Sequence, residues 1–313
     1  MNTKNELTEV AKKIAPFIHK TPVLSSSAIN KMLGLSVHFK CENFQKMGAF
    51  KMRGAANAVL SLSKSEKSKG VVTHSSGNFA QAVALASKMN RIKATIVMPS
   101  SAPSIKKEAV IGYGARVIEC APTLQAREET AERVILETGA TMLHPSNQIE
   151  VIMGNATAGM ELFDQIGEPD AIFTPVGGGG LLAGTALAKK GFAGGVRVFG
   201  GEPSGADDAH QSLKAGFIIP VENPKTIADG LRTSLGDVNF PIIKELVEDI
   251  FLVEESEIVD AMRLVWERMK IIIEPSSAVP LAALIKNKSQ FAGQTVGVIV
   301  SGGNVSLNAL PFS

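Results

Sequence analysis

The sequence has little cysteine and no long apolar segment without helix breakers, and each of these absences excludes a class of protein. Only two cysteines occur, Cys41 and Cys120, and they do not form a CxxC pair. This usage is typical of a reducing compartment and argues against a thiolate zinc site. The longest weakly charged run, residues 171–188, contains five glycines and a proline, so we do not expect it to span a membrane.

No block of like charge is present either. Charged residues make up 20% of the 313 positions, the net charge is +2, and both signs are interspersed, which argues against a nucleic-acid partner. The N-terminal stretch mixes charges along an amphipathic helix and lacks the apolar core of a signal peptide. With 45% apolar residues the chain can bury a large core. We therefore expect a cytoplasmic enzyme or small-molecule-binding protein without membrane partners.

Short apolar, often β-branched runs alternate with helical patterns along nearly the whole chain. This spacing predicts an α/β fold in which parallel sheets carry helices on both faces. No linker or repeat divides the chain, so two lobes that share a cleft are expected. The predicted strands are Val37–Lys40, Gly70–Thr73, Ala94–Met98, Ala115–Glu119, Ala171–Thr174, Val196–Gly200, Ile250–Val253 and Thr295–Val300.

Three of these strands lead into loops rich in Ser, Gly or Asn. The loops are residues 74–78 (HSSGN), residues 177–180 (GGGG) and residues 301–304 (SGGN). Because loops after parallel strands meet at one edge of a sheet, where ligands bind, we expect these three loops to form the site.

The four glycines at 177–180 lie between a predicted strand and a predicted helix. Bare backbone N–H groups and the helix N-terminus favour an anion such as phosphate. A glycine-rich turn that only permits close helix–sheet packing is the structural alternative. Gly178, Gly180 and Ala183 also match GxGxxA, with Glu202 at the end of the next strand, so this segment alone is compatible with a dinucleotide site.

Lys51 distinguishes the phosphate and dinucleotide interpretations. It lies between Phe50 and a run of small residues that predicts a closely packed helix start. A desolvated lysine has a lowered pKa and forms a Schiff base with an aldehyde cofactor, and Phe50 offers a ring to a flat heterocycle. Ser301 could then donate a hydrogen bond to a pyridine nitrogen, which gives a moderate electron sink. A lysine with its amine in water is the alternative.

Seven ordered segments together resemble the fold-type II (tryptophan synthase β-like) pyridoxal-phosphate enzymes. Within that fold they are most similar to the serine racemase and serine/threonine dehydratase group, which includes threo-3-hydroxyaspartate ammonia-lyases. The resemblance implies a large cofactor-binding lobe (1–64 and 148–313), a small mobile lobe (65–147) and a homodimer. The segments are KCENFQKMGAFKMRGA, THSSGNFAQA, VGGGGLLAG, EPSGADD, TIADG, LVWERMKIIIEPSSA and VSGGNVSL.

The resemblance implies a role for each residue around the cofactor. Lys51 would bind the cofactor aldehyde and act as base on one face of the substrate Cα, and Asn78 would bind the 3-oxygen of the ring. Phe50 and Gly230 would pack against the ring, and Ser301 would face its nitrogen. The phosphate would be held by Gly177, Gly178, Gly179 and Gly180.

Substrate contacts are implied for the loop after the second predicted strand. Ser75, Ser76, Gly77 and Asn78 would bind the α-carboxylate, and Ser76 would act as acid or base on the opposite face. An N-terminal helix cap is the structural alternative for Ser76, and both roles are compatible.

Arg127 occupies the position of an active-site arginine in similar enzymes. Its planar fork suits a second substrate carboxylate, whereas Glu129 and Arg133 at i,i+4 are typical of a solvated helix face.

A divalent cation site is also implied by the resemblance. Its ligands would be Glu202, the carbonyl of Ala206, Asp208 and waters, a set that suits Mg²⁺, Ca²⁺ or Mn²⁺. A solvated acidic turn is the alternative, and His210 nearby is interpreted as structural rather than as a ligand.

The expected activity is that of an ammonia-lyase converting serine, threonine or threo-3-hydroxyaspartate to a keto acid and ammonia, with racemisation as an accompanying or main activity. A β-replacement synthase, a dinucleotide oxidoreductase and a non-catalytic cofactor-binding protein are the alternatives. The sequence departs from the common pattern at Met47, Ala49 and Phe79-Ala80, where related enzymes have Thr, Ser and His-Gly. We expect these changes to affect nucleotide regulation or substrate preference.

Overall fold

The computed structural model describes residues 3–312 and contains two separate β-sheets within that range. The larger sheet has six strands in the order β1-β2-β10-β7-β8-β9. Only β1 runs antiparallel to its neighbour, and the other pairs are parallel. The strands are β1 (Val23–Ser25), β2 (Ser36–Cys41), β7 (Ala171–Pro175), β8 (Arg197–Pro203), β9 (Asp249–Val253) and β10 (Thr295–Val300).

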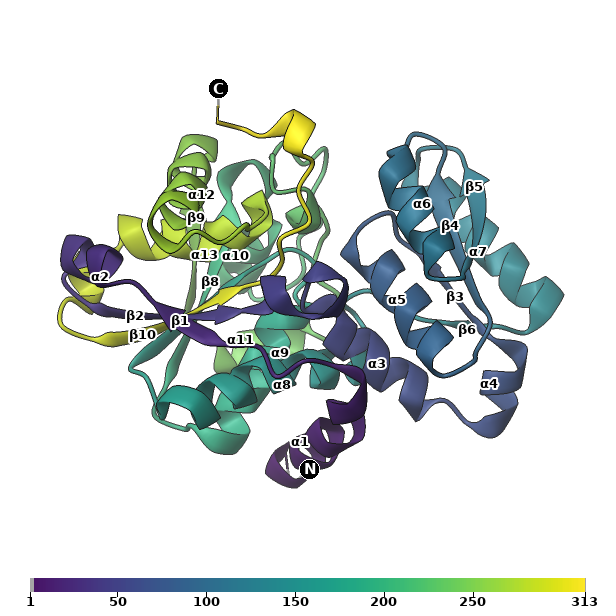
Figure 1. Ribbon diagram of the computed structural model, residues 1–313, viewed down its shortest axis with the longest axis horizontal. Helices are drawn as coiled ribbons and strands as arrows, with labels where there is room; N and C mark the ends of the chain where they lie inside the picture. Colours follow the sequence, from purple (N-terminus) through teal and green to yellow (C-terminus); the bar gives the residue numbers. More distant parts are fainter. Residues whose placement is uncertain (1–2, 313) are drawn as a thin grey trace.

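The smaller sheet is wholly parallel and forms a second lobe beside the first (Figure 1). Its strands follow the order β5-β4-β3-β6. All of them fall between residues 71 and 142, inside the range expected for the small lobe. They are β3 (Val71–His74), β4 (Ala94–Pro99), β5 (Arg116–Cys120) and β6 (Thr141–Met142).

Helices cover both sheets. No helix in the described part of the chain is both long enough and apolar enough to cross a bilayer. The helices are α1 (Thr3–Ile14), α2 (Ser27–Leu33), α3 (Lys51–Ser61), α4 (Lys64–Lys69), α5 (Asn78–Met89), α6 (Ser104–Gly112), α7 (Leu124–Thr138), α8 (Ile149–Ile166), α9 (Gly180–Phe192), α10 (Asp208–Ala215), α11 (Phe240–Leu246), α12 (Glu255–Met269) and α13 (Pro275–Lys286).

Alternation of side chains along the strands explains why each sheet is covered on two faces. In β3, Val71 joins a core with Val83 of α5, whereas its neighbour Val72 packs in a different core with Val134 of α7. The strands are apolar on both faces because helices bury both of them, as expected for parallel sheets.

The same rule holds in the larger sheet. Ile172 of β7 shares a core with Leu182 of α9, and Phe173 faces the core that contains Leu281 of α13. The Phe173 ring stacks on that of Phe199 from β8 at 5.2 Å between centroids. Both faces of the larger sheet are therefore packed against helices.

Helix α3 packs closely on α8 at the junction of the lobes (Figure 1). A Cβ added to Gly154 would lie 2.5 Å from the Arg53 carbonyl oxygen, and one added to Gly54 would lie 2.6 Å from Oδ1 of Asn155. The close packing expected after Lys51 is thus present, and it requires glycine on both helices. The helix begins at Lys51 itself.

A buried ion network holds the first turn of α3. The Arg53 guanidinium is fully buried and pairs with Glu42 (Nε to Oε2, 2.7 Å) and Glu161 (Nη1 to Oε1, 2.8 Å). Lys40 pairs with the same Glu161 at 2.7 Å. Removing one partner of such a buried ion pair costs several kcal/mol of folding free energy. The network therefore fixes the first turn of the helix at Arg53, two residues after Lys51.

Candidate active site

The loop that carries Lys51 is joined to the loop that follows β10. The Phe50 N–H donates to the carbonyl oxygen of Ser301 at 2.9 Å, and the Gly303 N–H donates to Gly48 at 2.9 Å. Ala49 and Gly302 form an isolated antiparallel bridge between these bonds. Two segments about 250 residues apart in sequence are therefore in direct backbone contact.

The Lys51 amine lies in an apolar, half-buried environment. Its Nζ donates to the carbonyl oxygen of Pro145 at 2.7 Å and lies 5.1 Å and 5.7 Å from the ring centroids of Phe50 and Phe79. Burial lowers the pKa of Lys51 to about 8, although the charge of Glu274 acts in the opposite direction. An amine of this kind is more readily deprotonated, and hence more nucleophilic, near neutral pH than a solvated lysine.

The glycine loop at 177–180 forms a tight cradle between β7 and α9. Gly179 has φ +76°, a conformation that favours glycine. A Cβ at Gly178 would lie 2.4 Å from Ser146 Oγ, and one at Gly177 would lie 2.7 Å from Leu231 Cα. The glycines keep open a space that side chains would fill. The first N–H groups of α9 have no partner within the helix, so the cradle fits a phosphate.

Gly230 lies beside this cradle in a short 3₁₀ turn (Asp229–Leu231). Its N–H donates to Ser276 Oγ at 3.1 Å, and a Cβ at Gly230 would come within 3.0 Å of the same oxygen. A side chain here would displace Ser276, so glycine is needed to keep this hydrogen bond.

Ser301 follows β10 and is almost completely buried, with 3% of its surface exposed. Its Oγ lies 2.9 Å from that of Ser277, which also hydrogen-bonds to the backbone of Gly302. The side chain directly after the carboxyl end of β10 is therefore a hydroxyl and not a carboxylate.

The loop after β3 brings the expected substrate-binding residues to the start of α5. Gly77 is the N-cap residue and no side chain caps this helix. The structural alternative for Ser76, that of a helix cap, is therefore wrong. The local hydrogen bond instead runs from the Gly77 N–H to Ser75 Oγ at 3.4 Å, which leaves the Ser76 hydroxyl available for another partner.

Glu274 is a site residue for which the sequence alone predicted no role. Both oxygens of its carboxylate accept hydrogen bonds from Nδ2 of Asn78, at 3.0 Å and 3.2 Å. Burial raises the pKa of Glu274 to about 7, and the charge of Asp229 adds to the effect. The only sequence signal was its place in the quoted EPSSA segment, before the proline that begins α13.

His144 lies close enough to Lys51 for the charge of the lysine to affect its pKa, and His74 lies beside His144. Nδ1 of His144 accepts the N–H groups of Ser146 and Asn147, at 3.2 Å and 2.8 Å, and burial lowers the pKa of His144 to about 4. Its ring makes an edge contact with that of His74, with centroids 6.4 Å apart. A neutral His144 whose Nδ1 accepts carries its proton on Nε2, so it is a hydrogen-bond donor there.

Arg127 lies on α7, in the same lobe as His74. Its Nε donates to the carbonyl oxygen of Thr123 at 3.4 Å. The pKa of His74 is lowered mainly by burial and, second, by the positive charge of Arg127. The Arg127 guanidinium is thus electrostatically coupled to the histidine that precedes the Ser-Ser-Gly-Asn loop.

The three residues expected to bind a cation lie around the end of β8. Glu202 is fully buried and accepts the N–H groups of Ala209 and His210, at 2.9 Å and 2.8 Å. Asp208 has one buried oxygen, Oδ1, without a hydrogen-bond partner, and burial raises its pKa to about 7. Ala206 is buried in the intervening 3₁₀ turn, Ser204–Ala206.

A buried carboxylate oxygen without a donor fits a cation ligand, and the hard oxygen set suits Mg²⁺ or Ca²⁺. The described residues contain no group of three or more His, Cys, Asp or Glu side chains that could hold a metal. A site here would therefore depend on the backbone carbonyl and on water. His210 bonds through Nδ1 to the Ile250 carbonyl oxygen at 2.6 Å, which agrees with a structural role.

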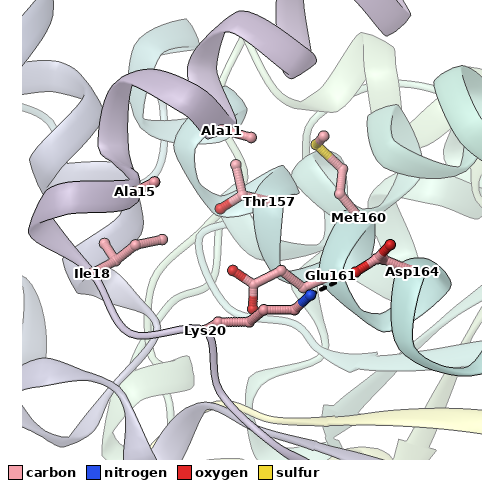
Figure 2. A pocket seen from close by; sticks show the side chains of 8 residues that line it. All are labelled: Ala11, Ala15, Ile18, Lys20, Thr157, Met160, Glu161 and Asp164. Atoms are coloured by element: carbon pink, nitrogen blue, oxygen red, sulfur yellow. Dashed lines mark hydrogen bonds and ion pairs between the residues drawn. The ribbon is translucent and has the colours of Figure 1, made fainter.

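A cavity of about 340 Å³ lies elsewhere, between the end of α1 and α8 (Figure 2). Lys20 and Asp164 form an ion pair at 2.6 Å on one side of it, and Glu161 of the buried ion network contributes to its wall. None of the expected site residues lines this cavity, so it is separate from the region around Lys51.

Comparison with known proteins assigns the class. Residues 14–302 match the family described as pyridoxal-phosphate dependent enzyme, and the chain belongs to this family. The cradle at 177–180, the half-buried amine of Lys51 and the hydroxyl of Ser301 fit that cofactor. The fold-type II architecture expected from the sequence is confirmed.

More particular similarities lie within one group of this family. The chain is 51% identical to serine racemase of Dictyostelium discoideum, over 98% of this chain and 96% of that protein. It is 46% identical to β-hydroxyaspartate dehydratase of Paracoccus denitrificans, over 99% of each. The structure of maize serine racemase has a TM-score of 0.95 at 46% identity and covers 97% of this chain and 94% of its own. The relatives are thus racemases and ammonia-lyases, as the sequence segments indicated.

Proposed function

We propose that this protein is an ammonia-lyase that converts a β-hydroxy amino acid to a keto acid and ammonia, and that it also racemises amino acids at the same site. The observation that carries this proposal is the amine of Lys51, with a pKa lowered to about 8, in a chain that belongs to the pyridoxal-phosphate dependent enzymes. The cofactor, when bound, supplies the electron sink that stabilises negative charge at the substrate Cα.

The protein groups would divide the remaining work. Lys51 would bind the cofactor aldehyde and, once free, take the Cα proton from one face. Gly177, Gly178, Gly179 and Gly180 would hold the phosphate, Phe50 and Gly230 would contact the ring, and Ser301 would face its nitrogen. A neutral hydroxyl does not hold a proton on that nitrogen as a carboxylate would, which favours loss of a β-leaving group over transamination.

The loop before α5 would hold the substrate. Backbone and hydroxyl donors of Ser75, Ser76, Gly77 and Asn78 are suited to an α-carboxylate at the helix N-terminus. Ser76, which does not cap the helix, would deliver or remove a proton on the face opposite Lys51. Elimination and racemisation would then differ only in whether the β-substituent leaves before that proton arrives.

The choice of substrate would depend on the small lobe. Arg127 and the Nε2–H donor of His144 are candidates for a second carboxylate, which supports threo-3-hydroxyaspartate beside serine and threonine. The name of the Paracoccus denitrificans relative supports the same class.

Several further properties belong to the same proposal. A divalent cation such as Mg²⁺ would bind Glu202, the Ala206 carbonyl and Asp208, where it would satisfy the unpartnered oxygen of Asp208. The small lobe (65–147) would move relative to the large lobe (1–64 and 148–313) to close over substrate. The enzyme would be a cytoplasmic homodimer, like the group it resembles.

The test is keto-acid release from both enantiomers of serine, threonine and threo-3-hydroxyaspartate, with and without Mg²⁺, together with chiral analysis of the remaining substrate. Release from one of these substrates supports the lyase. Inversion without keto acid would make racemisation the main activity. Neither product, with sulfide-dependent formation of cysteine instead, would replace the proposal with a β-replacement synthase.

A further inference from the structure

The side-chain amide of Asn78 is held from both sides by residues of the larger lobe. Its Nδ2 donates to Glu274, and its Oδ1 accepts from Nδ2 of Asn304 at 2.8 Å. Asn78 begins α5 next to the smaller sheet, whereas Glu274 and Asn304 lie before α13 and after β10. Three separate segments thus converge on one amide group.

The direction of this amide follows from a backbone carbonyl that can only accept. Nδ2 of Asn304 donates to the Met47 carbonyl oxygen at 2.9 Å, so the nitrogen of that amide, not its oxygen, must lie on this side. The same nitrogen also faces Asn78. The atom of Asn78 opposite it must therefore be the acceptor, Oδ1, and Nδ2 must face Glu274.

In its ionised form Glu274 favours the same direction. Its Oε2 accepts the backbone N–H of Asn304 at 3.1 Å, and above its pKa of about 7 the carboxylate accepts but does not donate. Its own N–H is bonded to the Gly302 carbonyl at 3.0 Å, and a Cβ at Gly302 would come within 2.9 Å of Oε1. With 5% of its surface exposed, the Glu274 side chain is buried among these partners.

We propose that Glu274 and Asn304 are positioning residues that orient the Asn78 amide, so that the remaining hydrogen of Nδ2 is directed to the 3-oxygen of the cofactor. This inference rests on the role of Asn78 in the proposed function. The two Glu274 oxygens would share one Nδ2 hydrogen, and Asn304 donates to Oδ1, so that the second Nδ2 hydrogen is left for the cofactor. If the amide were rotated by 180°, Oδ1 of Asn78 would face the 3-oxygen of the cofactor, and the two oxygens would repel each other.

The variants Glu274→Gln and Asn304→Asp test this. Glutamine has the same shape but places a donor against Nδ2 of Asn78, and aspartate at 304 places an acceptor against its Oδ1. A hydrogen bond to the ionised 3-oxygen favours the ionised form, which absorbs in the visible, over the neutral form, which absorbs in the near ultraviolet. We expect each variant of the holoenzyme to lose visible absorbance to the near-ultraviolet band. We also expect a roughly 3- to 10-fold higher dissociation constant for the cofactor.

Asn78→Ala and the double variant Asn78→Ala/Glu274→Gln complete the cycle, and Glu66→Gln is the matched control. Glu66 also accepts a backbone N–H, but in the capping box of α4. If Glu274 acts through Asn78, the double variant matches Asn78→Ala alone.

Two results would overturn the inference while leaving the role of Asn78 intact. One is unchanged absorbance in both Glu274→Gln and Asn304→Asp. The other is a full additional effect of Glu274→Gln when Asn78 is absent. Unchanged absorbance in Asn78→Ala would overturn the proposed role of Asn78 and this inference with it.

Discussion

The Nζ atom of Lys51 donates a hydrogen bond to the carbonyl oxygen of Pro145 at 2.7 Å. This bond joins the first residue of α3 to the segment that leads from the smaller sheet into α8. It satisfies an amine that the neighbouring aromatic rings keep away from water. A carbonyl oxygen, unlike a carboxylate, does not hold the amine permanently as an ion pair, so the amine remains available for chemistry.

Lys51→Ala is expected to lower turnover by at least about 10³-fold, because the variant lacks both the covalent attachment and the base. The visible absorbance of the loaded protein should disappear as well. Borohydride reduction of the wild type followed by peptide mass analysis should place the cofactor on residue 51. Lys64→Ala, at the exposed start of α4, is the control. Retention of the visible band in Lys51→Ala would contradict the assignment.

The lowered pKa of Lys51 predicts a pH-dependent stability of the cofactor-free protein. Between pH 8 and 10.5 the unfolded chain binds a proton that the folded chain does not, so the stability of the wild type rises with pH in that window. Below pH 8 both states are protonated and the penalty is constant. Lys51→Met should therefore be more stable than the wild type at pH 7, by at most about 3 kcal/mol, with the difference vanishing above pH 10.5.

Thermal unfolding of the two cofactor-free proteins from pH 7 to pH 10.5 measures this difference. Equal melting temperatures throughout, or a difference that grows with pH, would show that the amine is not desolvated in the folded protein.

Ser76→Ala is expected to separate the two proposed activities. Lys51 remains on its face of the substrate, so elimination from the enantiomer whose Cα proton points to Lys51 should change by less than about tenfold. Loss of a positioned acid or base typically costs about 10²–10⁴-fold, and racemisation should fall by that amount. Parallel keto-acid and chiral assays give the ratio. A proportional loss of both activities would indicate that Ser76 only binds substrate.

Arg127→Ala is expected to impair threo-3-hydroxyaspartate selectively, because serine lacks the second carboxylate. A lost charge-assisted hydrogen bond is worth about 1.5–3 kcal/mol, or roughly 10- to 100-fold in kcat/KM. Arg133→Ala, on an exposed position of the same helix, is the matched control. Equal losses on serine and hydroxyaspartate would contradict the assignment.

Addition of Mg²⁺ or Ca²⁺ to chelator-treated protein should raise its melting temperature. At a cation concentration of 100 times Kd the stabilisation is about 2.7 kcal/mol. Asp208→Asn should abolish this increase, because an amide replaces the carboxylate oxygen that lacks a partner. Asp207→Asn, next in the chain, is the control. The same increase in Asp208→Asn as in the wild type would show that the cation binds elsewhere.

The sequence was sufficient for the alternation of strands and helices and for the identity of the three loops. Strand β10 was predicted with both of its bounds, since an apolar, β-branched run and the turn residues that end it are local properties. The short strands β1 and β6 were missed, because they depend on pairing with β2 and β3 rather than on their own few residues. The sequence indicated no role for Arg53, although it is the centre of a buried ion network.

By itself the sequence determined which groups are present: an amine beside an aromatic ring, a glycine cradle and a hydroxyl after the last strand. Only the tertiary structure decided how far each is from water and which partner it has. The pKa of Lys51 depends on burial by residues distant in sequence. The direction of the Asn78 amide depends on Glu274 and Asn304, each about 200 residues away. Desolvation and hydrogen-bond direction arise from contacts across the fold, and no local pattern of residues encodes them.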